Sequence, residues 1–194
     1  NELYATTLNE ICLLREDRWH LITKLPAKGS CLWYNHKDSC FWVGTRSGLY
    51  SWKNNQFVKY PHPELESEHI VCMVSGIRNE VYLGTKNSGL FMLKDNVWKN
   101  ISTKDGLASD YCNHIYVDAM ERVWVSTNKG ISFFYEGHSE IIQTINRNNG
   151  LMTDEISATT VIDNTLFVAG TNGVVKIDID RITDSTTFPR VYIS

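Results

Sequence analysis

Several features that often reveal a function at once are missing from this sequence of 194 residues. It has no uninterrupted run of about 18 apolar residues, the length that a helix needs to cross a bilayer. No amino-terminal signal peptide is visible. The net charge of −3 does not favour nucleic-acid binding, which usually requires a strongly basic surface. Because the first residues already read as a strand, we expect the chain to be a piece of a longer protein.

Motifs of catalysis and metal binding are also missing. The sequence contains no Cys-x-x-Cys pair, no Gly-x-Ser-x-Gly and no phosphate-cradling loop of the Walker type. Its six histidines show no metal-ligand spacing. Paired acids such as Glu66 and Glu68 lie in expected loops, where carboxylates are mostly solvated or cap turns. We therefore predict no catalytic residue, no metal site and no cofactor.

The five cysteines give no clear redox signal. Their number is odd, so at least one is unpaired within the chain. An alignment of the repeated segments described below gives Cys31, Ile70, Cys112 and Ile156 the same position. A position shared with isoleucine is a packing position, and a buried cysteine behaves as a small hydrophobic residue. A structural role is therefore favoured over metal or redox chemistry.

What the sequence does contain is a repeated hairpin. The segment EVYLGTKNSGLFMLKDNVWKN (80–100) places two apolar runs around a polar turn that ends in glycine. Four similar segments are ELYATTLNEICLL (2–14), CFWVGTRSGLYSW (40–52), RVWVSTNKGISFF (122–134) and TLFVAGTNGVVKI (165–177). Their aromatic anchors Tyr4, Trp42, Tyr82, Trp124 and Phe167 follow one another at intervals of 38, 40, 42 and 43 residues. A period of about 40 residues is typical of propellers, solenoids and other repeat arrays.

The turn within each hairpin favours glycine because it needs a residue that tolerates a positive φ angle. Four copies supply one, namely Gly48, Gly89, Gly130 and Gly173. The first copy has Glu10 there, so its turn must differ or be strained. The last copy has Gly170 where the others have threonine. Both departures lie at the ends of the array, where repeats are often atypical.

Two further strands complete each repeat. Before three of the hairpins come LESEHIVCMV (65–74), LASDYCNHIYV (107–117) and LMTDEISATTV (151–161), and KGSCLWY (28–34) is a looser copy. The hydroxyl and acid in these segments suit a turn stabilised by side chains, and the apolar run that follows reads as a strand. An aromatic-rich strand such as VWKNI (97–101) follows each hairpin. With four strands per repeat, A to D, and almost no amphipathic helical stretch, the sequence predicts an all-β fold, a β-propeller of four-stranded antiparallel blades.

We expect an incomplete arc of about five blades within residues 1–187. The first blade is partial (1–24) and lacks strand A, and the others comprise about 25–62, 63–104, 105–148 and 149–180. Residues 188–194 (FPRVYIS) would begin a following domain or supply a closing strand. An open arc leaves apolar blade faces uncovered, so we expect the isolated chain to close irregularly or to form a homodimer through those faces.

The recurring motif [V/L]-W-V-G-T-x-x-G-L-Y resembles the two-component regulator propeller repeat. FWVGTRSGLYSW (41–52) and VYLGTKNSGLFML (81–93) are close matches, and residues 105–131 match over almost a whole repeat. The signatures of WD, kelch and sialidase-type blades do not recur. The resemblance covers residues 1–178 and implies the periplasmic sensor region of a membrane-anchored bacterial two-component protein that signals by rearrangement of subunits. It also implies a neighbouring propeller and an immunoglobulin-like domain as partners in the parent chain.

The candidate ligand site comes from the loops of a propeller. Loops from strand D to strand A and from B to C emerge on one face, which we call the loop face. In this sequence they hold ten candidate residues: Arg46, His69, Lys86, Asn87, Asp110, Tyr111, Asn128, Lys129, Asp154 and Asn172. Planar polar groups hydrogen-bond to sugar hydroxyls, and rings pack on sugar faces. The resemblance implies an oligosaccharide or another small ligand, although the simpler interpretation of each residue is an ordinary solvated loop position.

Two other functions stay open at this point. The chain could be a scaffold whose ligand is another polypeptide, and glycan binding would distinguish the two. A propeller enzyme such as a lyase would need an acid, a base and a cation that converge at the channel mouth. His69, Tyr111 and Asp154 lie on different expected blades and show no shared arrangement. Fold alone does not decide between these functions, and no nucleic-acid partner is expected for this segment.

Overall fold

The computed structural model describes residues 2–183, and these residues confirm the all-β prediction. They form eighteen β-strands, three short 3₁₀ turns and one short α-helix. The chain divides into two compact units, Asn1–Met73 and Val74–Ser194, with the boundary inside strand β8. Each unit has a hydrophobic core of its own.

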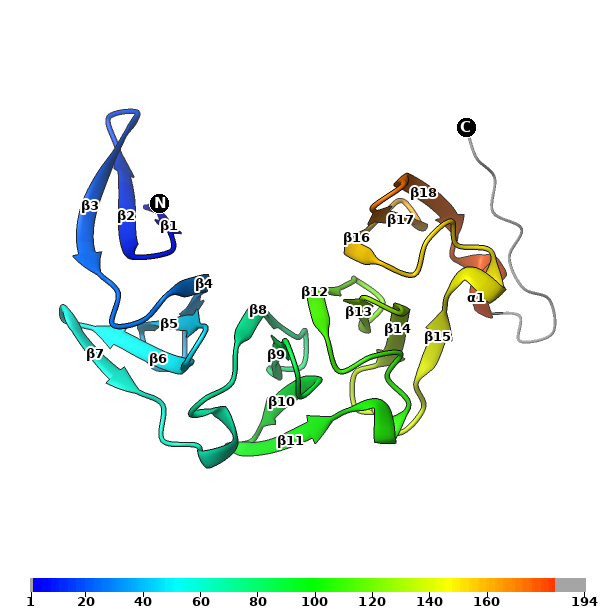
Figure 1. Cartoon of the computed structure of the whole chain (residues 1–194), viewed down its shortest axis with the longest axis horizontal. Coiled ribbons are helices and arrows are strands. Elements are labelled where there is room, and N and C mark those ends of the chain that lie inside the picture. Colours follow the sequence, from blue (N-terminus) through cyan, green and yellow to red (C-terminus); the bar gives the residue numbers. More distant parts are fainter. Residues whose placement is uncertain (1, 184–194) are drawn as a thin grey trace. The chain divides into compact units, whose positions relative to one another are not determined.

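Five antiparallel sheets contain all eighteen strands, and each sheet is a meander of strands consecutive in sequence (Figure 1). We call them blades 1 to 5 in chain order. Blade 1 contains β1 (Leu3–Thr6), β2 (Glu10–Arg15) and β3 (Arg18–Lys24), and blade 2 contains β4 (Gly29–Asn35), β5 (Cys40–Thr45), β6 (Gly48–Lys53) and β7 (Gln56–Lys59). Blade 3 contains β8 (Ile70–Ser75), β9 (Val81–Thr85), β10 (Leu90–Lys94) and β11 (Val97–Ile101), and blade 4 contains β12 (Cys112–Val117), β13 (Arg122–Thr127), β14 (Gly130–Tyr135) and β15 (Gln143–Ile145). Blade 5 contains β16 (Ile156–Ile162), β17 (Thr165–Gly170) and β18 (Gly173–Asp178), followed by α1 (Asp180–Thr183).

Such meanders are the blades of a β-propeller, so the predicted fold class is confirmed. The closing strand or domain entry predicted at residues 188–194 lies outside the described residues. The blades differ mainly in strand number, since blades 1 and 5 have three strands each among the described residues.

The hairpin turns explain the glycine pattern. Gly48, Gly89, Gly130 and Gly173 have φ angles of 110°, 75°, 116° and 121°, which glycine adopts without strain. The turn before Glu10 differs, as predicted for the first copy. None of residues 7–10 has a positive φ, and the Thr7 hydroxyl accepts hydrogen bonds from the N–H groups of Asn9 and Glu10 at 3.3 and 3.1 Å.

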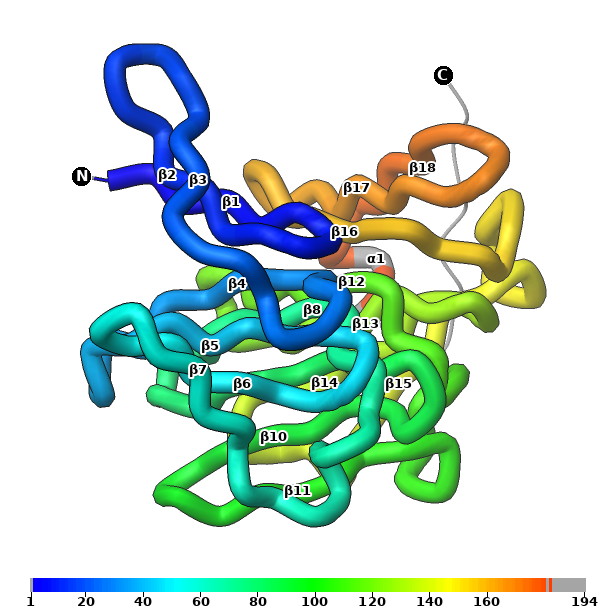
Figure 2. The backbone as a smooth tube through the Cα atoms, turned by 60° about the vertical axis from the view of Figure 1, so that its left-hand side comes forward, coloured from blue at the N-terminus to red at the C-terminus, as the bar shows by residue number. Residues whose placement is uncertain are grey.

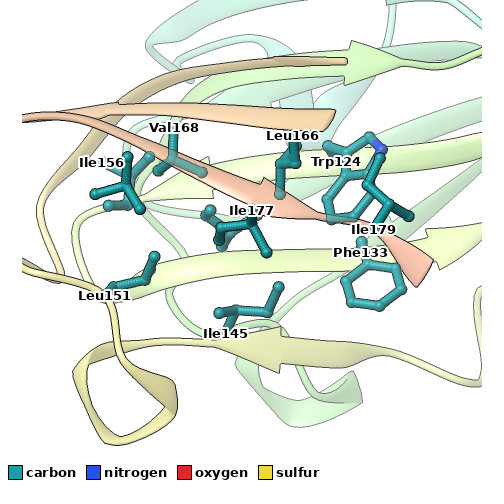
Figure 3. Close-up of a cluster of buried hydrophobic side chains, with 11 residues drawn as sticks. Trp124, Phe133, Ile145, Leu151, Ile156, Leu166, Val168, Ile177 and Ile179 are labelled. Carbon is teal, nitrogen blue, oxygen red and sulfur yellow. The ribbon is translucent and has the colours of Figure 1, made fainter. Parts of the chain in front are cut away.

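One hydrophobic core cluster of the second unit lies between blades 4 and 5. Leu166, Val168 and Ile177 of blade 5 pack against Trp124 and Phe133 of blade 4 (Figure 3). The Trp124 and Phe133 rings stack with their centroids 4.6 Å apart. Figure 1 shows β12 beside β16, and β15 farther out in the same sheet. Two facing sheets thus exclude water from a shared apolar layer, which is how propeller blades stabilise one another.

The core of the first unit lies between blades 1 and 2. Ile11 of β2 packs with Val43 of β5 and Trp52 of β6. Tyr4 of β1 contacts Phe41, with ring centroids 4.7 Å apart, and its ring edge meets Trp52 at 6.4 Å. In Figure 2 the strands of blade 1 run side by side, and β2 and β3 form a projecting hairpin closed by a short turn between Arg15 and Arg18. One face of blade 1 is therefore covered by blade 2.

The register of the first strand in blades 2, 4 and 5 shows that the predicted cysteine alignment is wrong for Cys31. The strand register shifts between Gly29 and Cys31 in β4, between Cys112 and His114 in β12, and between Ile156 and Ala158 in β16. Cys112 and Ile156 do share a position, but Cys31 lies two residues farther along and corresponds to His114. The motif in residues 28–34 is too weak to reveal this offset from the sequence. The pairing of Trp33 with Trp42 shows the actual register. Burial raises the pKa of the Cys31 thiol, which keeps it protonated.

Candidate functional site

One threonine in each of blades 2, 3 and 4 holds the turn between the second and third strands. In blade 2 the Thr45 hydroxyl donates to the carbonyl of Gly48 at 2.7 Å and accepts from the N–H of Ser47 at 3.1 Å. The same pair of bonds occurs from Thr85 to Gly89 with Ser88, and from Thr127 to Gly130 with Lys129. These threonines are fully buried, so the turns that carry Arg46, Lys86 and Lys129 are rigid supports.

The loops that lead into blades 4 and 5 are held by capping boxes. Ser102 and Asp105 exchange side-chain and backbone bonds around one 3₁₀ turn, and Asn146 and Asn149 do the same around the next. Each turn ends in a left-handed glycine, Gly106 or Gly150. Leu107 and Leu151 follow and are buried, which fastens both loops to the core.

Two of the predicted ligand residues support these loops with their carboxylates. Asp110 accepts hydrogen bonds from the N–H and the hydroxyl of Thr103 at 2.7 and 3.0 Å. Asp154 accepts one from the N–H of Arg147 at 2.7 Å. The predicted turn stabilisation by hydroxyl and acid is thus present, because Ser109 also accepts from the N–H of Tyr111 at 3.1 Å. These carboxylates are engaged by the protein itself, so the neutral and cationic neighbours are the groups left for a ligand.

Backbone hydrogen bonds join three of the glycine turns to the loop that enters the next blade. The N–H of Gly89 donates to the carbonyl of Asp110 at 2.9 Å, and the N–H of Gly130 donates to that of Asp154 at 2.7 Å. In the first unit, the N–H of Gly48 donates to Glu68 at 2.8 Å. The predicted loop residues of adjacent blades are therefore adjacent in space as well.

The second unit brings several predicted residues together on this loop face. The Lys86 ammonium lies 5.4 Å from the centre of the Tyr111 ring, a cation–π contact. Asn87, Asn128, Lys129 and Asn172 are exposed at the tips of their turns. Thr153 and Thr171 share a hydrogen bond of 3.3 Å beside a small apolar pocket that Leu151, Asn172 and Val175 help to line. The arrangement offers amide and ammonium donors next to an aromatic ring.

Arg46 and His69 lie on two neighbouring loops of the first unit. Arg46 is exposed, and its N–H donates to the carbonyl of Lys28 at 2.8 Å. His69 is half-buried, and its Nε2 lies 3.1 Å from the hydroxyl of Ser30. The bond between Gly48 and Glu68 keeps these two loops side by side.

The sequence interpretation missed a buried acidic cluster at the other ends of the strands in blades 3 and 4. Glu136, after β14, is fully buried and accepts hydrogen bonds from the N–H groups of Ile77 and Arg78 at 2.9 and 3.2 Å. Glu80 is also fully buried and accepts from Lys94 Nζ at 2.8 Å. Arg78 itself forms an ion pair with Glu121. The cluster therefore ties blade 4 to the first turn of blade 3.

Blade 4 builds the equivalent turn with a carboxylate of its own. Asp118 accepts from the N–H groups of Met120 and Arg122 at 2.9 and 3.0 Å, and from Arg122 Nε and Trp124 Nε1 at 2.6 and 2.8 Å. In blade 3 the same position is Gly76, six residues before the aromatic anchor. A Cβ on Gly76 would lie 1.7 Å from Glu136 Oε1. The carboxylate of Glu136 thus occupies the place of the missing aspartate.

Burial sets the protonation of this region. It raises the pKa of Glu136, although the N–H groups of Arg78 and Ile77 oppose the shift. It also raises the pKa of Tyr82, and the charges of Glu136 and Glu80 raise it further, so the hydroxyl stays neutral. In the loop face, by contrast, hydrogen bonds from Ser102 lower the pKa of Asp105.

Residues 2–183 offer neither a cluster of metal ligands nor a helix of membrane-spanning length. No group of three or more His, Cys, Asp or Glu side chains in this range is placed to hold a metal ion. No helix in this range is long and apolar enough to cross a membrane.

Comparison with known proteins identifies the fold. No family model matches the sequence, and no curated protein matches it. The extracellular domain of the hybrid two-component system BT3049 from B. thetaiotaomicron superposes with a TM-score of 0.77 at 15% identity, over 99% of this chain and 27% of that chain. PorZ, a surface component of the type-IX secretion system of Porphyromonas gingivalis, has a TM-score of 0.71 at 15% identity, over 98% and 33%. Virginiamycin B lyase from Staphylococcus aureus has a TM-score of 0.54 at 14% identity, over 88% and 63%.

These similarities concern the fold, since the identities are low. The chain spans about a third or less of the length of the first two matched chains. The same fold occurs in the extracellular domain of a two-component system, a secretion component and a lyase, so it does not assign an activity. The predicted resemblance is confirmed at this level: the chain has the β-propeller fold found in extracellular domains of two-component systems.

Proposed function

We propose that this chain is a non-catalytic segment of an extracytoplasmic sensor propeller in a bacterial two-component regulatory protein, and that its loop face binds an oligosaccharide. The observation that carries the proposal is the match over 99% of the chain to the extracellular domain of a hybrid two-component system. The parent protein would signal through a rearrangement of its subunits when the ligand binds, because a ligand shifts an equilibrium only if it prefers one arrangement. Its location would then be the periplasm.

The chemistry of the loop face supports a neutral, hydroxyl-rich ligand. Lys86 and Lys129 donate hydrogen bonds, and the amides of Asn128 and Asn172 both donate and accept. The Tyr111 ring, beside the Lys86 ammonium, offers an apolar surface on which a sugar ring can pack. The threonine-held turns and the capping boxes fix these groups before a ligand arrives, which lowers the entropic cost of binding.

Isothermal titration calorimetry with the chain, after a glycan-array survey, tests the proposal. Lys86→Ala and Tyr111→Ala should each weaken binding of the oligosaccharide that the array selects by about tenfold, the loss expected when one good contact worth about 1.4 kcal/mol is removed. Gln143→Ala is the matched control, since Gln143 is exposed on β15, away from the loop face, and should leave binding unchanged.

Two results would contradict the proposal. Absence of binding to every oligosaccharide on the array, with a folded chain by circular dichroism, would reject an oligosaccharide as the ligand. Binding that survives both loop-face substitutions would reject the loop face as its site.

A further inference from the structure

Two fully buried glutamates face each other where blade 3 packs against blade 4. Glu80 directly precedes β9 and lies two residues before Tyr82, so these two side chains share one face of blade 3. Glu136 directly follows β14 and lies two residues after Phe134, so it shares the face of Phe134 in blade 4. The rings of Tyr82 and Phe134 meet edge to face with their centroids 6.1 Å apart. The two carboxyl groups therefore lie at the same end of this contact, and neither is exposed.

The turn that enters β9 brings the two glutamates together. The N–H of Gly76 donates to the carbonyl of Glu80 at 2.8 Å, which closes this turn. Glu136 Oε1 lies against Gly76, on the side where a Cβ would be, and the Tyr82 ring lies 3.1 Å from the same place. Glu136 Oε2 accepts two backbone N–H groups, at 2.9 and 3.2 Å, whereas Oε1 shares only the N–H of Ile77, at 3.1 Å. Oε1 is therefore the oxygen that is turned toward the pair of Gly76 and Glu80.

The charges around the two glutamates do not balance. Lys94 pairs with Glu80 Oε1 at 2.8 Å, and Arg78 pairs with Glu121. Within residues 2–183, Glu136 forms no ion pair. Glu80 Oε2 is fully buried and accepts no hydrogen bond from a residue of the same range. A buried carboxylate without a cation is costly, so such a group takes up a proton instead.

The other groups near Glu136 do not supply the missing cation. Burial raises the pKa of Glu136, and the charges of Glu80 and Glu121 raise it further, although the N–H groups of the β8–β9 turn oppose the rise. Tyr82 stays neutral, since burial raises its pKa as well. The remaining polar and charged side chains on the elements around Glu136 are engaged in pairs of their own: Asp118 with Arg122, His138 with Glu140, and Lys99 with Ser139.

We propose that Glu136 is a protonated carboxylic acid that donates a hydrogen bond from its Oε1 to Oε2 of Glu80. Donor and acceptor are complementary, because the proton supplies the O–H that Glu80 Oε2 lacks, while Glu136 Oε2 still accepts its two N–H groups. One proton thus joins blade 4 to blade 3. When the pH rises and the proton leaves, two buried carboxylates face each other, and the turn at residues 76–80 should separate from blade 4. The contact between these neighbouring blades therefore responds to pH.

Carbon NMR of the glutamate carboxyl groups, recorded while the wild-type chain is titrated, tests the proposal. Glu136 should titrate at a higher pH than Glu140, an exposed acid on the same connection. Glu80→Gln removes the facing charge and should move the titration of Glu136 to lower pH. Glu140→Gln is the matched control, since it removes an exposed carboxylate and should leave the titration of Glu136 unchanged.

Amide hydrogen exchange at Ile77 and Arg78 reports the consequence for the turn. Their protection factors should fall as the pH passes the midpoint of Glu136, by about tenfold for each pH unit by which its pKa in the closed turn exceeds that in the open turn. Glu136→Gln should keep the protection and lose its pH response, because the amide donates to Glu80 and its carbonyl accepts the N–H groups.

Three outcomes would overturn the proposal. They are a Glu136 that titrates together with the exposed glutamates, a midpoint that Glu80→Gln does not move, and a wild-type protection at Ile77 and Arg78 that does not change with pH. The first and the third need no substitution, so the proposal can be refuted even if a variant fails to fold. None of these results depends on oligosaccharide binding, so the two proposals can fail separately.

Discussion

Moving one carboxylate from blade 4 to blade 3 tests the link between these two blades. In blade 3 the N–H groups of Ile77 and Arg78 donate hydrogen bonds to Glu136, which belongs to blade 4. In blade 4 the corresponding turn donates its hydrogen bonds to Asp118 of the same blade. Gly76 occupies the corresponding position and has no positive φ, so its backbone accepts a side chain. The only severe obstacle is Glu136 Oε1, which lies 1.7 Å from the place of a Cβ. Glu136→Ala removes that obstacle and the two accepted bonds together.

From the structure we expect Gly76→Asp to lower the free energy of unfolding of the wild-type chain and to raise that of the Glu136→Ala variant. Glu136→Ala leaves two partly buried N–H groups unpaired, and at about 1–3 kcal/mol each it should lower the free energy of unfolding by about 3 kcal/mol. Gly76→Asp alone should lower it by about 2 kcal/mol or more, because overpacking and like charge add. In the Glu136→Ala background, Gly76→Asp should instead recover about 1–2 kcal/mol, since the new carboxylate accepts the freed N–H groups within its own blade.

Denaturant unfolding measures these free energies, and amide hydrogen exchange at Ile77 and Arg78 reports the turn directly. Glu140→Ala is the control, since Glu140 is an exposed acid on the same connection and its loss should cost no more than about 0.5 kcal/mol. The reasoning would be refuted if Gly76→Asp lowered stability equally in both backgrounds, because Glu136 would then not occupy the aspartate position.

Substitutions at three positions probe the turn, the buried acid and the core. Thr127→Val should lower the free energy of unfolding by about 1–2 kcal/mol and speed amide exchange at Lys129, whereas Thr127→Ser keeps both hydrogen bonds and should behave nearly as wild type. The pKa of Glu136 is raised above 4.5 in the folded state, so its contribution to stability is complete below pH 4.5 and falls as the pH rises through the raised value. The free energy of unfolding of wild type relative to Glu136→Gln should therefore decrease with rising pH, and a constant difference would contradict the assignment. Leu166→Ala should cost about 2–5 kcal/mol by opening a cavity between blades 4 and 5, and calorimetry that finds less than 1 kcal/mol would contradict the packing of Figure 3.

The features that depend on local sequence were predictable. The glycine turns follow from a conformation that one residue must adopt, so Gly48, Gly89 and Gly130 could be placed without a structure. The hydroxyl and acid before each first strand, such as Ser109 and Asp110, also act within about ten residues of themselves. The repeat period and the composition of the strands were then sufficient to predict the blade fold.

Features that join distant residues were not predictable in the same way. Glu136 acts on Ile77, 59 residues away, and only the missing aspartate at Gly76 gives a hint of it. The position of Cys31 was misassigned because the connection between the first and second strands differs in length among the blades: Trp33, Tyr116 and Thr160 lie opposite Trp42, Trp124 and Phe167 at separations of 9, 8 and 7 residues. For the candidate site, the sequence indicated which residues lie in loops. The structure adds that Asp110 and Asp154 are engaged by their own loops, whereas Lys86 and Tyr111 lie together.

The meander order of the strands has a consequence for how the molecule is made. Each strand within a blade pairs with the strand next to it in sequence, so every hairpin closes a short loop at low entropic cost. Such local contacts allow rapid folding for an all-β chain. During synthesis, a blade can assemble once its own strands have left the ribosome, without waiting for the carboxyl-terminal end. Translation then adds blades one at a time, and each finished sheet offers its apolar side as the template on which the next one condenses.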